Sequence, residues 1–245
     1  MHGMSKHVYI ITGASSGLGA ALSRELLSEE TLVLGISRTV NKEIQQLAQD
    51  LKANYAFIAA DLTQVERIEA TLREIIESMD SSKVETITLI NNAATVTPFN
   101  PIEACSSDEI VSSIQLNLTA PILLTSSFMK ETANWTVKRV IVNISSGSGQ
   151  YPASSMSVYC SSKAALNMFT KCVAMEQKKE GNPVHLLTID PGMMNTGMQQ
   201  IARESDFELA AYFRKQNEEG HLAKPETVAR NIVLEISRHR DGTLA

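Results

Sequence analysis

Tyr159 and Lys163 stand four residues apart in the segment YCSSK, and this spacing could support proton transfer. Residues four apart share one face of a helix, so the phenol and the ammonium can come close. A free tyrosine has a pKa of about 10 and is a poor acid or base near neutral pH. A neighbouring ammonium favours the phenolate, so we expect a lowered pKa at Tyr159 and a role in general acid–base catalysis. The alternative is a tyrosine packed against a lysine stem on an ordinary helix.

Two more polar residues fit the same chemistry. Ser145-Ser146-Gly147 ends an apolar run shortly before Tyr159, and a hydroxyl there can donate to a substrate carbonyl oxygen. Asn117 lies inside a long helical pattern, where asparagine has poor helix propensity. A role in holding water beside Lys163 would explain its presence.

The segment TGASSGLG, residues 12–19, has the spacing of a phosphate-binding loop. Its glycines fall as GxxxGxG between an expected strand and an expected helix, where Gly13 permits a tight turn and Gly19 permits close packing. The helix N-terminus offers N–H groups and partial positive charge to an anion. We therefore expect a dinucleotide diphosphate to contact Gly13, Ser15, Ser16, Gly17, Leu18 and Gly19.

The end of the second expected strand indicates which dinucleotide binds. An NAD site usually has an acidic residue there for the adenosine ribose, but this strand ends at Ser37-Arg38. A guanidinium suits a 2′-phosphate, so Arg38 favours NADP(H) over NAD(H). The alternative is a solvated surface arginine.

Three other strand ends carry residues that we expect to contact the cofactor. Taken alone, each is more typical of ordinary loops, but they share one position relative to the strands. These residues are Asp61 and Leu62, Asn92 and Ala93, and Pro191, Gly192, Met194 and Thr196.

Strand-length apolar runs alternate with helical patterns along the chain, which is typical of βαβ units. This alternation predicts an α/β protein with a three-layer, doubly wound Rossmann fold and a mostly parallel sheet. The expected strands are His7–Thr12, Thr31–Ile36, Tyr55–Ala59, Thr86–Asn91, Arg139–Ser145 and Val184–Asp190. The expected helices are Gly17–Ser28, Asn41–Ala53, Thr63–Met79, Ser107–Thr132, Ser157–Glu180 and Pro225–Arg238.

The rhythm predicts a single domain over residues 4–245. We expect residues 1–3, before Met4, to be a cloning remnant. Residues 193–222 break the alternation after the sixth expected strand, where sheets of this kind bind ligands. We expect this segment to form a substrate lid. A surface helix pair without such a role is the alternative.

Composition excludes several other functions. The 245 residues carry a net charge of -5, so we expect neither nucleic acid nor an anionic membrane as a partner. The three cysteines and five histidines form no metal-binding spacing, so no metal is expected. The first apolar run is too short for a signal peptide or a membrane helix, which favours the cytoplasm.

Together these motifs resemble the short-chain dehydrogenases/reductases over nearly the whole chain. The shared segments are TGASSGLG (12–19), NNAA (91–94), the Asn117 helix, ISS (144–146), YCSSK (159–163) and PG (191–192). Ala94 replaces the glycine usual in the second motif. Within the family, the segment TGMQQIARES (196–205) resembles sepiapterin reductases, and the chain also resembles bacterial benzil reductases that form (S)-benzoin.

The resemblance implies a catalytic tetrad of Asn117, Ser146, Tyr159 and Lys163. Ser146 rather than Ser145 matches the family serine. In such a tetrad the tyrosine gives a proton, the serine orients the carbonyl, the lysine holds the nicotinamide ribose and the asparagine holds water. Family geometry also implies a substrate pocket lined by Ser146, Gln150, Tyr151, Met156, Tyr159, Met193, Met194 and Met198; simple core filling is the alternative for each methionine.

The resemblance implies NADPH-dependent reduction of one carbonyl of a 1,2-dicarbonyl compound, with benzil as the first candidate and sepiapterin as the second. Asp241 lies near the place of a pterin-anchoring aspartate. The alternatives are a broad ketone, quinone or aldehyde reductase and a non-catalytic NADP-binding sensor. A sugar-nucleotide epimerase would need a larger C-terminal domain. Relatives pair their long helices, so we expect a homodimer or homotetramer.

Overall fold

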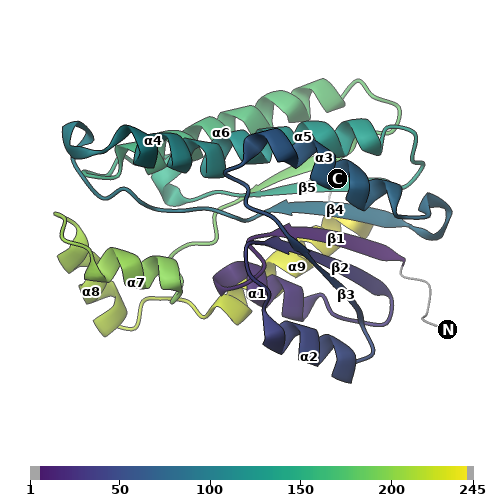
Figure 1. Cartoon of the computed structure of the whole chain (residues 1–245), viewed down its shortest axis with the longest axis horizontal. Helices are drawn as coiled ribbons and strands as arrows, with labels where there is room; N and C mark the ends of the chain where they lie inside the picture. Colours follow the sequence, from purple (N-terminus) through teal and green to yellow (C-terminus); the bar gives the residue numbers. More distant parts are fainter. Residues whose placement is uncertain (1–5, 242–245) are drawn as a thin grey trace.

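The computed structural model describes residues 6–241, and the expected cloning remnant and both ends of the expected domain lie outside them. Six strands form one sheet in the order β3-β2-β1-β4-β5-β6, with helices on both faces (Figure 1). Every neighbouring pair among these strands is parallel. The fold is therefore the expected three-layer Rossmann arrangement. The strands are β1 His7–Thr12, β2 Thr31–Ser37, β3 Asn54–Ala59, β4 Thr86–Asn91, β5 Lys138–Ile144 and β6 Val184–Ile189.

The two sides of the central strand β1 enter two different cores. Tyr9 and Ile11 pack on the side of α1 (Gly17–Glu25), α2 (Lys42–Asp50) and α9 (Pro225–Asp241). Val8 and Ile10 pack on the side of α3 (Ile68–Glu77) and α5 (Ala120–Glu131). Because both faces are covered, the strands have apolar runs without polar alternation.

The helix expected over residues 107–132 is divided. It consists of α4 (Ser107–Ile114), a π-helical turn (Gln115–Thr119) and α5. Pro121 supplies a reason, since it has no N–H for the carbonyl four residues earlier and its ring disfavours a regular α-turn there. That carbonyl belongs to Asn117. The helix α6 (Ser157–Gln177) lies beside α4 and α5 on the same side of the sheet (Figure 1).

Residues 193–222 contain two helices, α7 (Gly197–Glu204) and α8 (Ala210–Glu218), which lie away from the layers of the sheet (Figure 1). We call residues 193–222 the lid segment after their expected role, which stays a prediction. Within residues 6–241, none of the helices combines the length and the apolar composition needed to cross a bilayer.

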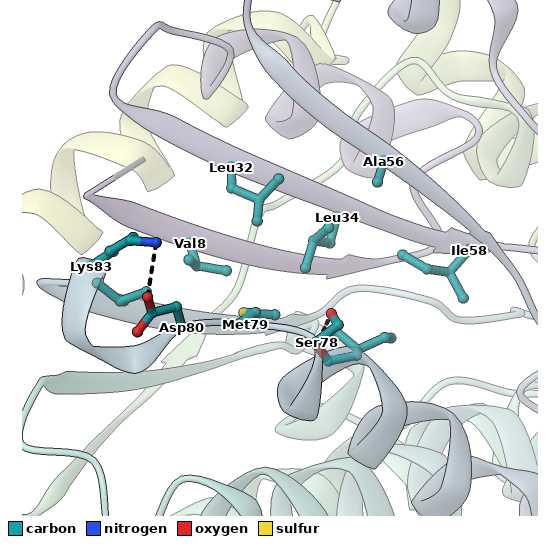
Figure 2. A pocket seen from close by; sticks show the side chains of 11 residues that line it. Val8, Leu32, Leu34, Ala56, Ile58, Ser78, Met79, Asp80 and Lys83 are labelled. Atoms are coloured by element: carbon teal, nitrogen blue, oxygen red, sulfur yellow. Dashed lines mark hydrogen bonds and ion pairs between the residues drawn. The ribbon is translucent and has the colours of Figure 1, made fainter. Parts of the chain in front are cut away.

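An apolar hollow of about 310 Å³ lies over the face of β2 and β3, beside the end of α3 (Figure 2). Leu32, Leu34, Ala56 and Ile58 line it from the two strands, and the Lys83–Asp80 ion pair lies at its margin, at 2.9 Å. The helix α3 packs mainly on α5, so it leaves the outer strand β3 only half-buried. We call this feature the edge hollow.

Candidate active site

The glycine loop has the predicted tight geometry. Gly13 and Gly17 have φ angles of +67° and +53°, a region that favours glycine. A Cβ atom on Gly13 would lie 2.9 Å from the Cα of Ala93, and one on Gly19 would lie 2.2 Å from the Gly13 carbonyl oxygen. The loop, the start of α1 and the end of β4 are therefore packed backbone to backbone.

The start of α1 is open to an anion. Its N-cap residue Ser16 is extended, and its side chain caps no N–H group. Thr196 likewise leaves the start of α7 without a side-chain cap. Both helix ends face one polar cleft of about 520 Å³, which also contains Ser15, Gly17 and Arg203. Uncapped N–H groups, two helix dipoles and a guanidinium suit a diphosphate, so the residues fit a nicotinamide dinucleotide.

Hydrogen bonds tie the ends of β1 and β4 together beside this cleft. The Thr12 hydroxyl accepts from the N–H groups of Asn92 (2.9 Å) and Ala93 (3.0 Å), and Asn92 Nδ2 donates to the Thr12 carbonyl at 2.9 Å. Asn91 at the end of β4 joins this strand to β5, since its Nδ2 donates to Asn143 Oδ1 at 2.8 Å. The asparagine pair of the NNAA motif is therefore a structural clamp at the carboxyl end of the sheet.

Arg38 and Asp61 lie at the ends of β2 and β3. The Asp61 carboxylate accepts from the Thr63 N–H (3.0 Å) and hydroxyl (2.8 Å). These bonds lower the pKa of Asp61, with a smaller contribution from the positive charge of Arg38. Arg38 is exposed and free to meet a phosphate. The Leu62 side chain is buried in the core, so a cofactor contact there would come from its main chain.

The two neighbouring serines after β5 have different partners. Ser145 is buried and its hydroxyl donates to Asn167 Oδ1 at 2.5 Å, so it is structural. Ser146 is half-buried, and its hydroxyl accepts from the Ser148 N–H at 3.2 Å. The turn that follows is pressed onto α6, since a Cβ on Gly149 would lie 3.0 Å from the carbonyl carbon of Lys163. This close approach sets Ser146 beside Tyr159.

Tyr159 and Lys163 are both buried on α6, at 7% and 3% exposure. Burial raises the pKa of Tyr159, and a hydrogen bond with Ser146 partly offsets the rise. Burial also lowers the pKa of Lys163 to about 8. The predicted lowering of the Tyr159 pKa is therefore wrong for this structure. Lys163 Nζ donates to the Ile144 carbonyl at 2.8 Å and lies 5.8 Å from the phenol ring centre, and its charge is not among the causes of the pKa shift at Tyr159.

The Asn117 side chain holds the loop after β4. Its Oδ1 accepts from the Thr95 N–H and its Nδ2 donates to the Thr95 carbonyl, both at 2.8 Å, and Nδ2 also donates to Ser113 at 3.3 Å. Both amide hydrogens are thus used within the protein. Water binding beside Lys163 stays a prediction. The main-chain carbonyl of Asn117 would bind that water, because Pro121, four residues later, has no N–H to donate to it.

The expected substrate residues separate into three groups. Met156 and Met198 pack with Tyr159. Met194 packs instead on the α1 and α9 side, which favours its expected cofactor contact over a substrate contact, and Met193 is half-buried. Tyr151 is 72% exposed and Gln150 is also exposed, so both side chains face solvent, and their contact with a substrate stays a prediction.

Apolar residues that the motifs did not indicate share one cluster with Tyr159. Phe99 and Val96 from the loop after β4 join its cluster, as do Phe207 and Phe213 from the lid segment. Sequence alone showed only apolar residues in a loop and in an irregular segment. Their common site depends on how the lid segment folds back.

Pro191 and Gly192 follow β6, and Gly192 has a φ of +69° with its N–H donating to Asp190 Oδ1 at 3.0 Å. This turn brings Thr196 within van der Waals distance of a Cβ placed on Gly17, at 3.5 Å. A profile of the short chain dehydrogenase family matches residues 7–206. The chain belongs to this family. It is therefore an oxidoreductase that acts on carbonyl and hydroxyl groups with a nicotinamide cofactor.

Curated relatives within this short chain dehydrogenase family cover almost all of the chain. A benzil reductase ((S)-benzoin forming) from Bacillus cereus is 44% identical over 95% of this chain and 96% of its own length. The protein of the same name from Bacillus subtilis is 40% identical over 92% and 91%. Sepiapterin reductase from Rattus norvegicus is 30% identical over 94% and 91%.

Solved structures share the fold. A dehydrogenase structure from Beutenbergia cavernae with bound NADP has a TM-score of 0.79 at 25% identity, covering 94% of this chain and 90% of that chain. The KRED1-Pglu enzyme has a TM-score of 0.77 at 26% identity, covering 91% of each chain. The predicted resemblance to this family and to both groups of reductases is confirmed.

Proposed function

We propose that this short chain dehydrogenase is an NADPH-dependent carbonyl reductase that reduces one carbonyl of a 1,2-dicarbonyl compound, as in the conversion of benzil to (S)-benzoin. The observation that carries the proposal is the convergence of Ser146, Tyr159 and Lys163 at the carboxyl end of the sheet, under an apolar lid. The 44% identity to a benzil reductase supports the substrate class.

The proposed roles follow from the contacts. NADPH supplies the hydride when bound. Tyr159 donates the proton, since burial keeps its phenol protonated. Ser146 forms a hydrogen bond with Tyr159. Its hydroxyl also donates to the substrate carbonyl oxygen and so orients it. Lys163 holds the nicotinamide ribose, and its positive charge stabilises the phenolate that develops on Tyr159.

Arg38 supports the choice of NADPH over NADH. It is exposed at the end of β2, close enough to Asp61 for its charge to act on that carboxylate. We expect Arg38→Asp to weaken NADPH binding by about 10- to 100-fold and to leave NADH binding unchanged or improved, because a charge-assisted pair is lost. Fluorescence titration with both cofactors measures this without turnover. An unchanged affinity ratio would remove Arg38 from the argument.

The substrate proposal is tested by following NADPH oxidation with benzil, sepiapterin, a simple ketone, a quinone and an aldehyde. Fastest turnover of benzil supports the dicarbonyl assignment. Fastest turnover of sepiapterin favours the pterin, the second candidate. The side chain of Asp241, the expected pterin anchor, lies outside the described residues. Equal rates across the panel favour the broad reductase, and NADPH binding without turnover favours the sensor.

Self-association is a further part of the proposal. Val111 on α4 and Met168 and Met175 on α6 are apolar and more than half exposed, which supports pairing through these long helices into a homodimer or homotetramer. Light scattering measures the assembly directly. A cytoplasmic location stays a prediction.

A further inference from the structure

We propose that Phe99 and Phe207 select an aromatic substituent on the carbonyl substrate. Phe99 belongs to the loop after β4, and Phe207 belongs to the lid segment between α7 and α8. Their rings are stacked, with centroids 4.3 Å apart and planes 22° apart. Phe213 of α8 continues the stack, with its ring centroid 5.9 Å from that of Phe207. The lid segment is thus joined to the wall of the site through aromatic faces.

This stack belongs to the surroundings of the reacting tyrosine. Phe99 and Tyr159 share one buried cluster with Met156, and Phe207 and Phe213 pack against it. Phe99 is 6% exposed and Tyr159 is 7% exposed. Because lid residues contribute to the cluster that buries Tyr159, we infer that a bound carbonyl compound places its substituent beside the two phenylalanine rings.

The chemistry of that space discriminates between substituents. Parting Phe207 from Phe99 removes a stacked contact between two rings. An aryl group on the substrate restores an offset or edge-to-face contact on insertion, and such ring pairs stabilise beyond their buried area. A saturated ring of the same size buries similar apolar area without restoring that contact. Aryl-substituted carbonyl compounds are consequently favoured over their saturated counterparts.

The inference rests on the proposed carbonyl reduction, and a matched pair of substrates separates the two. The pair is 1-phenyl-1,2-propanedione and 1-cyclohexyl-1,2-propanedione, which differ in aromaticity more than in size. We expect wild type to show a higher kcat/KM for the phenyl compound, and Phe207→Leu to reduce this preference by about 2- to 10-fold. The variant should show a higher KM for the phenyl compound and an unchanged kcat, since Phe207 touches no reacting atom.

Two further variants sharpen the test. Phe99→Leu should reduce the preference by the same factor, and the double variant should lose little more, because the two rings act as one pair. Tyr212→Leu is the matched control. Tyr212 lies on the same lid segment, is 48% exposed and touches Phe213 only edge-on, so its loss should leave the preference unchanged.

The contrary outcomes point to different errors. An equal fall in kcat/KM for both diones in Phe207→Leu would mean that Phe207 only supports lid packing. If kcat/KM changed for neither dione, Phe207 would not be a selecting residue. If wild type reduces neither dione, the dicarbonyl assignment fails instead. Benzaldehyde and cyclohexanecarbaldehyde then give the same comparison for any carbonyl reductase. Absence of all carbonyl turnover would overturn the proposed function itself.

Discussion

Two regions of the sheet, the carboxyl ends of the strands and the edge hollow, differ in how their side chains are held. At the carboxyl end, polar groups are engaged one by one, as in the pairing of Asn91 with Asn143 and of Lys163 with the Ile144 carbonyl. On the face of β2 and β3, the edge hollow is lined mainly by apolar side chains that only pack, such as Leu32 and Leu34 (Figure 2). The first region places groups to within hydrogen-bond distance, whereas the second tolerates unfilled space.

The physical origin of this difference lies in the parallel topology. All carboxyl ends of the strands meet at one edge, where the N-termini of α1 and α7 add partial positive charge. At the edge hollow, the end of α3 and the turn after it face apolar side chains of β2 and β3. We therefore expect changes at the carboxyl end to affect turnover and changes at the edge hollow to affect stability.

Tyr159→Phe should show the largest effect on turnover. Loss of the proton donor should reduce carbonyl reduction by about 10²- to 10⁴-fold, which is the usual size of positioned proton transfer. The phenyl ring keeps its packing, so the free energy of unfolding should change by less than about 1 kcal/mol. Steady-state rates and urea unfolding measure both. Turnover that survives would show that Tyr159 is not the acid.

Leu34→Ala should show the reverse pattern. Leu34 is 7% exposed and lines the edge hollow, so truncation enlarges an existing void and should lower the free energy of unfolding by about 2–4 kcal/mol. Turnover per folded molecule should be unchanged. Leu51→Ala is the control, because Leu51 is 48% exposed. Its truncation should lower the free energy of unfolding by less than about 1 kcal/mol. A loss of turnover per folded molecule in Leu34→Ala would contradict the separation between the edge hollow and the carboxyl ends of the strands.

Lys163→Met should reveal the burial of the ammonium through pH. The folded pKa is about 8 against an ordinary 10.5, so between these values the unfolded chain binds more protons than the folded chain. Stability of wild type relative to the variant should therefore rise with pH through this window, by at most about 3 kcal/mol. Below pH 8 and above 10.5 the difference should be level. Urea unfolding across this range measures it.

A level difference throughout would mean that the Lys163 ammonium keeps its hydration. Leu34→Ala serves as the comparison, since Leu34 does not titrate and its stability difference should not vary with pH.

Ala56→Val should give the smallest effect. Ala56 is exposed on β3 and faces the edge hollow (Figure 2), and a β-branched side chain suits a strand. Partial filling should raise the free energy of unfolding by about 0.5–1 kcal/mol, with turnover unchanged. Thermal unfolding measures the gain. A loss of stability would show that the hollow is too narrow for two more methyl groups.

Sequence by itself determined the elements and the sites that depend on short spacing. The six strands, the glycine loop and the Tyr159–Lys163 pair follow from local periodicity, from turn chemistry and from four-residue helical spacing. The order of the parallel strands then brings their carboxyl ends to one edge, so the expected positions of Ser146 and Arg38 also follow. Such features need only neighbours along the chain or one general rule of topology.

Tertiary structure decided what depends on packing between distant segments. Only burial shows that the pKa of Tyr159 rises, because desolvation disfavours the charged phenolate. Only the path of the lid segment brings Phe207 onto Phe99, and only the turn after Ser146 exposes Tyr151. Desolvation and ring contacts depend on which atoms surround a group in space, and residues far apart along the chain supply those atoms.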